Sequence, residues 1–432
     1  MSQQTAQTIP ALAPADMDDY DPNSMSVNKA RQFIKQYLSP VQQTEMLALR
    51  ESLGRVLAAN ILSPANVPNY DNSAMDGYAY NTNDICTDGP TQLKVITTIF
   101  AGKSSNIALK SDECARIMTG GMMPTGADSV IMQERVTVAE GLITFTDAPK
   151  HGMNVRYAGE DLQQGQTVLA AGHCMRAADL GLIASLGIAE VSVYRKLKVA
   201  FFSTGDELAG VGDVLKIGQV YDSNRYTLFG MLSRMGVEII DLGAIADDPI
   251  LLEKTLLAAA SQADVVITSG GVSVGEADYM KLLLAKHGQV VFWKIAMKPG
   301  RPLAYGKIQG NNANTAHYFG LPGNPVAVMV TFYQFVREAM LILMGQTNTA
   351  PLPSFMVECT EKIKKMTGRT EFQRGILFAD SDGIWKVKPT GSQGSAILSS
   401  MSLANCFIVL DENVGNLEPG SLVSVQVLDG MT

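Results

Sequence analysis

The stretch DVVITSGGVSVGEADYMKLLLAKHG, residues 264–288, decides the fold. It begins with a short apolar run rich in β-branched side chains, which is typical of a buried strand. An amphipathic run ends it and predicts a helix, so Gly270, Gly271 and Gly275 lie where the chain turns from strand to helix. Backbone N–H groups at such a turn can bind an anion.

The same alternation of strand and helix patterns runs onward from Leu197. It predicts βαβ units in a mainly parallel sheet with helices on both faces. Ligands bind such sheets beyond the carboxyl ends of the strands. Polar loops follow the predicted strands at 203–207, 268–278 and 298–302, so we expect a site at that edge. The motif LPGNP, 321–325, then opens a long apolar helix.

The remaining segments divide the chain into further parts. Residues 1–24 have the composition of a flexible tail. Residues 26–40 and 50–64 predict two helices, and the helical pattern returns in RAADLGLIASLG. Short β-branched runs predict an inserted β module between them and a small antiparallel β domain after about residue 350. The resulting division is a helical linker domain at 25–68 and 155–195, an inserted β domain at 69–154, an α/β domain at 196–348 and a C-terminal β domain at 349–432.

Composition excludes several classes of protein. A chain of 432 residues with a net charge of -8 and no basic run lacks the positive surface of a nucleic-acid binder. The five cysteines and four histidines show no zinc-ligand spacing, which indicates a reducing compartment and no soft-metal site. The N-terminus lacks the features of a signal peptide, and we find no run of roughly 18 apolar residues, so we expect a cytoplasmic protein without a membrane partner.

The glycine turn combines features of two kinds of site. Its glycine spacing is that of a phosphate-binding loop, but Glu276 stands where that loop carries lysine. This carboxylate argues against an ordinary nucleotide hydrolase. A Mg²⁺ ion held by one or two carboxylates and phosphate oxygens would reconcile the glycines with Glu276 and Asp278. Alternatively, the two acids only complement the helix dipole, which stabilises a helix by about 0.3–1 kcal/mol.

Other charged residues follow predicted strands at the same edge. Asp206 and Glu207 form a second acidic loop, and two such loops at one edge favour a site. Asp248 precedes Pro249 and predicts a helix N-cap, whereas the local pattern decides nothing for Asp247.

Three cations, Lys294, Lys298 and Arg301, lie within eight residues beside Pro299 and Pro302. They could hold phosphate or another oxyanion, or they could form a solvated edge.

Read together, the motifs resemble one family, the molybdopterin molybdenumtransferases, from about residue 26 to the C-terminus. The resemblance rests on their joint occurrence in order. They are NYDNSAMDGYA (69–79), RIMTGGMMPTGAD (116–128), AGEDLQQGQTV (158–168), FFSTGDEL (201–208), QVYDSNR (219–225), SGGVSVGEADYMK (269–281), KIAMKPGRP (294–302), GLPGNP (320–325) and FQRG (372–375).

The resemblance implies an elongated homodimer whose protomer has a three-layer α/β molybdopterin-binding domain, a helical linker domain, an inserted β domain and a C-terminal β barrel. The implied site lies between the α/β domain of one subunit and the inserted β domain of the other. The implied reaction inserts molybdenum from molybdate into adenylylated molybdopterin and releases AMP with Mg²⁺ present. A molybdopterin adenylyltransferase and cofactor-delivery proteins are the implied partners.

The resemblance also assigns residues, each by its motif. Catalytic roles fall to Asp76, Glu207, Asp278, Lys294 and Lys298, with Glu207 and Asp278 as metal ligands. The implied binding residues, in which Arg374 and Ser395 join Lys298 in a molybdate pocket, are Thr119, Asp247, Ser269, Gly270, Gly271, Ser273, Gly275, Pro322, Pro325, Arg374 and Ser395.

The chain departs from the usual family pattern at Tyr70, at Arg301 and in the longer hairpin at 310–317. Two alternatives remain open. A molybdopterin adenylyltransferase-like enzyme shares the α/β domain, and a non-catalytic molybdopterin-binding scaffold needs no turnover.

Overall fold

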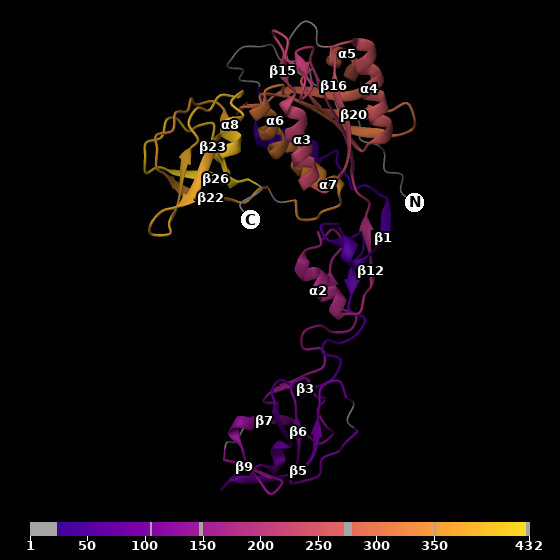
Figure 1. Ribbon diagram of the computed structural model, residues 1–432, viewed down its shortest axis with the longest axis vertical. Helices are drawn as coiled ribbons and strands as arrows, with labels where there is room; N and C mark the ends of the chain where they lie inside the picture. The colour runs from indigo at the N-terminus through magenta and orange to yellow at the C-terminus, as the bar shows by residue number, and fades with distance from the viewer. Residues whose placement is uncertain (1–23, 104–105, 147–149, 272–278, 350, 429–432) are drawn as a thin grey trace. The chain divides into compact units, whose positions relative to one another are not determined.

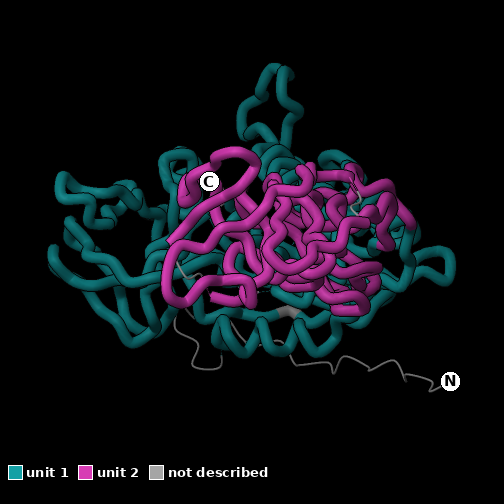
Figure 2. Tube along the Cα trace, turned by 90° about the horizontal axis from the view of Figure 1, so that it is seen from below, with its two compact units in different colours: residues 1–45, 54–56, 193–432 teal, residues 46–53, 57–192 magenta. Residues whose placement is uncertain are grey.

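The computed structural model describes residues 24–103, 106–146, 150–271, 279–349 and 351–428. They form two compact units, each built from segments that are distant in sequence (Figure 2). Unit 1 comprises residues 1–45, 54–56 and 193–432, and unit 2 comprises residues 46–53 and 57–192.

In the described part of unit 1, six strands form a twisted sheet in the order β16-β13-β17-β21-β20-β18. The first four are mutually parallel, as the alternating sequence pattern predicted. β20 is antiparallel to both of its neighbours, because residues 295–301 reverse the chain between β18 and β20 and a hairpin at 310–314 joins β20 to β21. The strands are β13 (Lys198–Thr204), β16 (Glu238–Ile245), β17 (Val265–Ser269), β18 (Gly288–Lys294), β20 (Pro302–Gln309) and β21 (Thr315–Leu321).

Helices cover both faces of this sheet, which makes three layers (Figure 1). Alternate side chains of one strand enter different cores: Phe202 packs with α4 and α5, and Phe201 packs with α3 and the helix after β21. The predicted N-cap at Asp248 is confirmed, since its carboxylate accepts from the Leu251 N–H at 2.8 Å. The helices are α1 (Val27–Lys35), α3 (Ser223–Arg234), α4 (Pro249–Gln262), α5 (Tyr279–His287), α6 (Pro325–Thr331) and α7 (Arg337–Leu343).

The predicted apolar helix after LPGNP is α6, a π-helical turn at Phe332–Val336 and α7 in succession. By length and composition alone Pro325–Leu343 could cross a membrane. It is not a continuous apolar run, however, because Gln334, Arg337 and Glu338 interrupt it. Within unit 1 the helix is a core element: 67% of its most apolar stretch is buried, and the Tyr333 ring packs edge to face with Phe407 of the C-terminal domain.

The C-terminal domain is a small closed barrel. Among residues 351–428, five strands follow one another in the order β23-β24-β22-β26-β25, and a β23–β25 pairing closes the ring. A two-residue strand of the α/β domain, β19 (Met297–Lys298), joins the barrel by pairing in parallel with β23. The barrel strands are β22 (Ser354–Cys359), β23 (Thr370–Ala379), β24 (Trp385–Pro389), β25 (Cys406–Leu410) and β26 (Leu422–Val427), with helix α8 (Ser399–Leu403) between β24 and β25.

The predicted inserted β module lies in unit 2. In its described residues, six strands form a sheet in the order β7-β4-β6-β5-β9-β8. They are β4 (Gly77–Tyr80), β5 (Thr91–Ile99), β6 (Glu113–Ile117), β7 (Ser129–Met132), β8 (Thr137–Ala139) and β9 (Leu142–Phe145). Shorter elements of this unit are β2 (Ile61–Leu62), β3 (Asn72–Ser73), β10 (Val155–Arg156), β11 (Thr167–Leu169) and α2 (Ala177–Ser185).

The prediction of a helix at 50–64 was wrong. This segment is a single 3₁₀ turn, Leu49–Ser52, followed by extended chain that ends in β2. Gly54 takes a φ of +73°, and the N–H groups of Leu57 and Ala58 donate to distant carbonyls at His173 and Ser192. Such tertiary pairing overrides a weak helical preference.

We predict opposite effects of the same substitution at two glycines. A Cβ on Gly306, in the middle of β20, would lie 2.1 Å from the carbonyl oxygen of Gln289, whereas one on Gly181, exposed in α2, meets no atom within 4 Å. Gly306→Ala should destabilise the protein by about 1–3 kcal/mol or more. Gly181→Ala should stabilise it by about 0.5–1 kcal/mol. Thermal unfolding at one protein concentration measures both, and equal melting temperatures would contradict this packing.

Candidate active site

A cavity of about 760 Å³ lies at the carboxyl edge of the unit 1 sheet. Its walls are the loops that follow β13, β16, β17, β19 and β21, together with Arg369 and residues 393–395 of the barrel. Parallel strands bring their carboxyl ends to one edge, so loops that are far apart in sequence meet here. The cavity gathers eight of the residues that the resemblance assigned, and Arg301 of the predicted cation group also lines it. The eight are Glu207, Asp247, Ser269, Gly270, Gly271, Lys298, Pro322 and Ser395.

One wall of the cavity is acidic. The Glu207 carboxylate folds over Gly205, where a Cβ would lie 2.6 Å from it, so this position accepts no larger residue without displacing the acid. The Asp247 N–H donates to the Asp206 carboxylate at 3.1 Å. Partial desolvation, and then repulsion by Asp206 and Glu207, raises the pKa of the Asp247 carboxyl. This wall therefore carries negative charge that is not fully compensated.

The glycine turn passes close to the end of β13. Gly270 and Gly271 have φ values of +90° and +65°, and a Cβ on Gly270 would lie 2.6 Å from the Thr204 carbonyl oxygen. The backbone conformation and the close approach both require glycine at position 270. The proposed site residues Ser273, Gly275 and Asp278, and the acid Glu276, lie outside the described residues.

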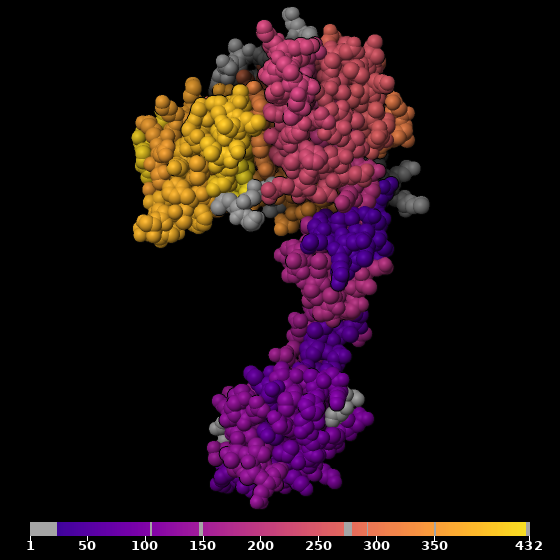
Figure 3. All heavy atoms as spheres, viewed as in Figure 1, coloured from indigo at the N-terminus to yellow at the C-terminus, as the bar shows by residue number. Residues whose placement is uncertain are grey.

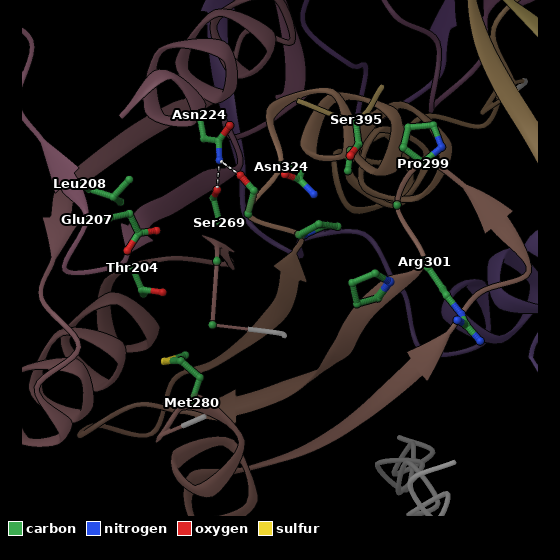
Figure 4. Close-up of a pocket in the computed structure, with 18 of the residues that line it drawn as sticks. Thr204, Glu207, Leu208, Asn224, Ser269, Met280, Pro299, Arg301, Asn324 and Ser395 are labelled. Carbon is green, nitrogen blue, oxygen red and sulfur yellow. Dashed lines mark hydrogen bonds between the residues drawn. The ribbon is translucent and has the colours of Figure 1, made fainter. Parts of the chain in front are cut away.

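The opposite wall carries cations. Lys298, Arg301 and Arg369 line it, and Figure 4 shows Arg301 and Pro299 across the pocket from Glu207 and Thr204. The Lys298 ammonium lies 3.6 Å from the Glu371 carboxylate of β23. Lys294, at the end of β18, is not among the residues that line the cavity.

Ser395 reaches the cavity, whereas Arg374 lies behind it. Arg374 is 1% exposed, and burial lowers the pKa of its guanidinium to about 10. Its Nε donates to the Ser400 hydroxyl at 2.9 Å and its Nη2 to the Gly394 carbonyl at 2.9 Å. Arg374 thus fixes the loop that presents Ser395, whose carbonyl also accepts from the Val326 N–H at 3.1 Å.

The LPGNP motif shapes another part of the wall. Pro322 lines the cavity, and Pro325 is the first residue of α6, after Asn324 at the N-cap position. Proline is well tolerated there because an N–H group at the first helical position would have no hydrogen-bond partner within the helix.

Asp76 and Thr119, both proposed from the sequence, belong to unit 2 and contact each other. The Thr119 N–H and hydroxyl each donate to Asp76 Oδ1 at 2.7 Å. These two hydrogen bonds lower the pKa of the Asp76 carboxyl. The structure therefore joins two residues that lie in separate sequence motifs.

Sequence reasoning missed Asn224, Arg369 and Gln393 of the cavity wall. Asn224 lies in the first turn of α3, and its amide nitrogen donates to the Ser269 hydroxyl and to the Gly323 carbonyl, both at 2.7 Å (Figure 4). The motif QVYDSNR contained Asn224, but a polar residue there normally signals only a helix start. Its long-range partners have no local signature.

The donor set fits a magnesium ion only in part without substrate. Among the described residues, no group of three His, Cys, Asp or Glu side chains is arranged to hold a metal. Mg²⁺, however, is usually held by one or two carboxylates together with substrate phosphates and water. Glu207 and Asp247, on a wall whose carboxylates repel each other, are suitable for that kind of binding.

Family models match the chain in three consecutive parts. The "MoeA N-terminal region (domain I and II)" matches residues 25–187, a "Probable molybdopterin binding domain" matches residues 200–341, and the "MoeA C-terminal region (domain IV)" matches residues 356–428.

Individual relatives match over nearly the whole length. A molybdopterin molybdenumtransferase from Haemophilus influenzae is 46% identical over 403 residues, which cover 93% of this chain and 98% of that one. One from Nostoc sp. is 36% identical over 378 residues, covering 86% of each chain. A crystal structure of the molybdopterin biosynthesis moeA protein from Pyrococcus horikoshii has a TM-score of 0.81 at 28% identity, covering 94% of this chain and 100% of that one. The chain therefore belongs to the MoeA family, the molybdopterin molybdenumtransferases of molybdenum cofactor biosynthesis.

Proposed function

We propose that this enzyme inserts molybdenum from molybdate into adenylylated molybdopterin and releases AMP in a Mg²⁺-dependent reaction. The observation that carries the proposal is the division of one cavity into an acidic and a cationic wall. Two anionic substrates, a phosphoanhydride and molybdate, need separate places so that they do not repel each other. The divided cavity offers a separate place for each substrate.

The acidic wall takes the phosphoanhydride. Glu207 and Asp247, with Asp278 assigned by resemblance, would hold Mg²⁺, which neutralises phosphate charge when bound. The backbone of Gly270 and Gly271 borders the same space. The acids alone would repel the substrate, which is why turnover should require the cation.

The cationic wall takes molybdate. Lys298 and Arg301 supply positive charge, and Ser395 supplies a hydroxyl. Arg374 commits Nε and Nη2 to Ser400 and to the loop at 392–394. Arg374 therefore acts by fixing the loop that presents Ser395. Lys294 and, in unit 2, Asp76 keep the catalytic roles that the resemblance assigns to them.

Asn224 positions two loops of the site. It is 8% exposed and connects the end of β17 with the LPGNP turn through Ser269 and Gly323. Because the Gly323 carbonyl can only accept, the side chain must direct its NH₂ group toward it. The two loops are thereby held at a fixed separation on the cavity wall.

A homodimer agrees with an apolar surface on unit 1. The segment from β14 (Leu208–Ala209) to β15 (Val220–Tyr221) and the adjoining face of α3 lie at the surface (Figure 3). They expose the large apolar side chains Val211, Val214, Leu215, Ile217, Val220, Tyr221, Tyr226 and Phe229. Soluble monomers rarely leave so many apolar side chains in one region open to water. We propose that a second copy of the chain covers this surface, and that an adenylyltransferase and cofactor-delivery proteins act before and after this enzyme.

The first prediction for this reaction concerns the acidic wall. Glu207→Gln should lower molybdate-dependent AMP release by about 100-fold or more, because losing a carboxylate ligand removes ~2.7 kcal/mol or more of charge stabilisation. Higher Mg²⁺ should restore part of the rate. Glu238→Gln is the matched control, since the exposed Glu238 carboxylate pairs at the surface with Lys198 at 3.6 Å and does not line the cavity.

The same assay separates the alternatives. Tight molybdopterin binding by the wild type without AMP release would indicate a scaffold. Formation of adenylylated molybdopterin from a nucleotide would indicate an adenylyltransferase-like enzyme.

The second prediction concerns Asn224. Asn224→Ala should lower kcat/KM for adenylylated molybdopterin by about tenfold, because it removes the donor that the Ser269 hydroxyl and the Gly323 carbonyl share. Asn224→Asp should lose at least as much, since a carboxylate would face that carbonyl. Ser269→Ala removes only one of the two contacts and should lose less. Steady-state kinetics on variants with unchanged melting temperature checks the order, and a Ser269→Ala defect as large as that of Asn224→Ala would contradict it.

The third prediction concerns the apolar surface. Sedimentation of the wild type should show a dimer, and Phe229→Glu should shift it toward monomer by placing a charge at the interface. Leu282→Glu, at an exposed apolar side chain of α5 in the same unit, is the control and should leave the dimer intact. A dimeric Phe229→Glu protein would mean that the second copy does not cover this surface.

A further inference from the structure

A buried carboxylate lies behind the cationic wall. Glu371 is 3% exposed in β23, and the parallel pairing of β19 with β23 sets it directly beside Lys298. Its Oε1 lies 3.6 Å from the Lys298 ammonium, whose side chain is half exposed and lines the cavity. The backbone of Lys298 is thus fixed by strand pairing. Its ammonium lies near a carboxylate that is almost completely shielded from water.

The second oxygen of Glu371 is held in place as well. Oε2 accepts from the Gln373 side-chain amide at 2.9 Å, and the same amide donates to the Lys364 carbonyl at 2.9 Å. Gln373 is itself 4% exposed, so the barrel wall fixes both the Gln373 amide and the Glu371 carboxylate that it contacts. The carboxylate therefore cannot follow the lysine if the lysine moves.

A second lysine lies on the barrel side. Lys365 is 5% exposed and donates to the carbonyls of Met366 and Val414, at 3.1 and 2.8 Å. Burial lowers the pKa of its ammonium, and the Glu371 carboxylate acts in the opposite direction. Glu371 could therefore serve the stability of the barrel through Lys365, the site through Lys298, or both.

We propose that Glu371 is a positioning residue for Lys298 and holds its ammonium at the cavity wall in the place where molybdate binds. This inference rests on the proposed function. A free lysine side chain carries about 2 kcal/mol of rotamer entropy that anion binding must otherwise remove. A carboxylate fixed in a poorly hydrated place attracts the ammonium more strongly than an exposed one does, and salt screens the attraction less. The remaining N–H donors of Lys298 are left for the oxyanion.

The test is a double-mutant cycle on the full-length enzyme with molybdate as the varied substrate. Glu371→Gln keeps the shape and the acceptor for Gln373 but removes the charge. It should raise KM for molybdate about five- to tenfold, with kcat at saturating molybdate changed less than about twofold. In a Lys298→Gln background the same substitution should add no further increase. An unchanged KM, or effects that multiply in the double variant, would overturn the proposal.

Two further variants separate positioning from a structural role. Lys365→Gln removes the other cation that Glu371 influences and should leave KM for molybdate unchanged, even where it changes the melting temperature. Glu371→Asp keeps the charge on a shorter side chain and should give a KM between those of wild type and Glu371→Gln. If Glu371→Gln does not fold, Glu371→Asp takes its place in the comparison with the wild type. A KM that rises as much in Lys365→Gln would assign Glu371 to the barrel alone.

Equilibrium dialysis with molybdate alone distinguishes this inference from the proposed function. If the wild type binds molybdate but releases no AMP, the proposed reaction fails, while weaker binding by Glu371→Gln still supports the positioning role. If the wild type releases AMP and Glu371→Gln binds molybdate equally well, the reaction stands and the positioning role fails.

Discussion

The common end of three parallel strands is the constraint on which the site depends. Ser203 of β13 is in register with Ser269 of β17, which is in register with Leu321 of β21. The acidic loop, the glycine turn and the LPGNP turn therefore leave the sheet at the same level. A shift of one residue in this register would turn every side chain to the other face and separate the loops. The buried strands Lys198–Thr204 and Val265–Ser269 pack on both faces, which fixes the register.

The acidic and the cationic side chains of the cavity come from different elements of the fold. The acids come from loops that follow parallel strands of the sheet, and the cations come from the β19–β20 turn and from the barrel. Partial desolvation, and then repulsion by the neighbouring acids, raises the pKa of the Asp247 carboxyl. Polar contacts of Asn224, in the cavity wall, and of Arg374, behind it, fix the loops without adding charge to the acidic side. Binding and positioning are thus carried out by different residues.

The sequence predicted the parts of this architecture that have a local signature. The βα alternation, the N-cap at Asp248 and the polar loops at the sheet edge follow from periodicity and turn chemistry, and the structure contains them. Contacts between distant segments have no such signature. Hence Asn224 and Arg369 were missed, and Arg374 gave no sign that its side chain is buried. The helix expected at 50–64 failed for the same reason, since distant carbonyls at His173 and Ser192 fix its backbone.

The two-residue bridge between β19 and β23 has a consequence for how such chains can evolve. Lys298 belongs to the α/β domain and Glu371 to the barrel, yet the pairing makes them neighbours in one ladder. Recombination in the connection near residue 350 would exchange the barrel and separate the two positions. A barrel from a relative would be accepted only where its strand keeps both the register and an acid at the equivalent of Glu371. The two domains should therefore be inherited together, and positions 298 and 371 should change in concert.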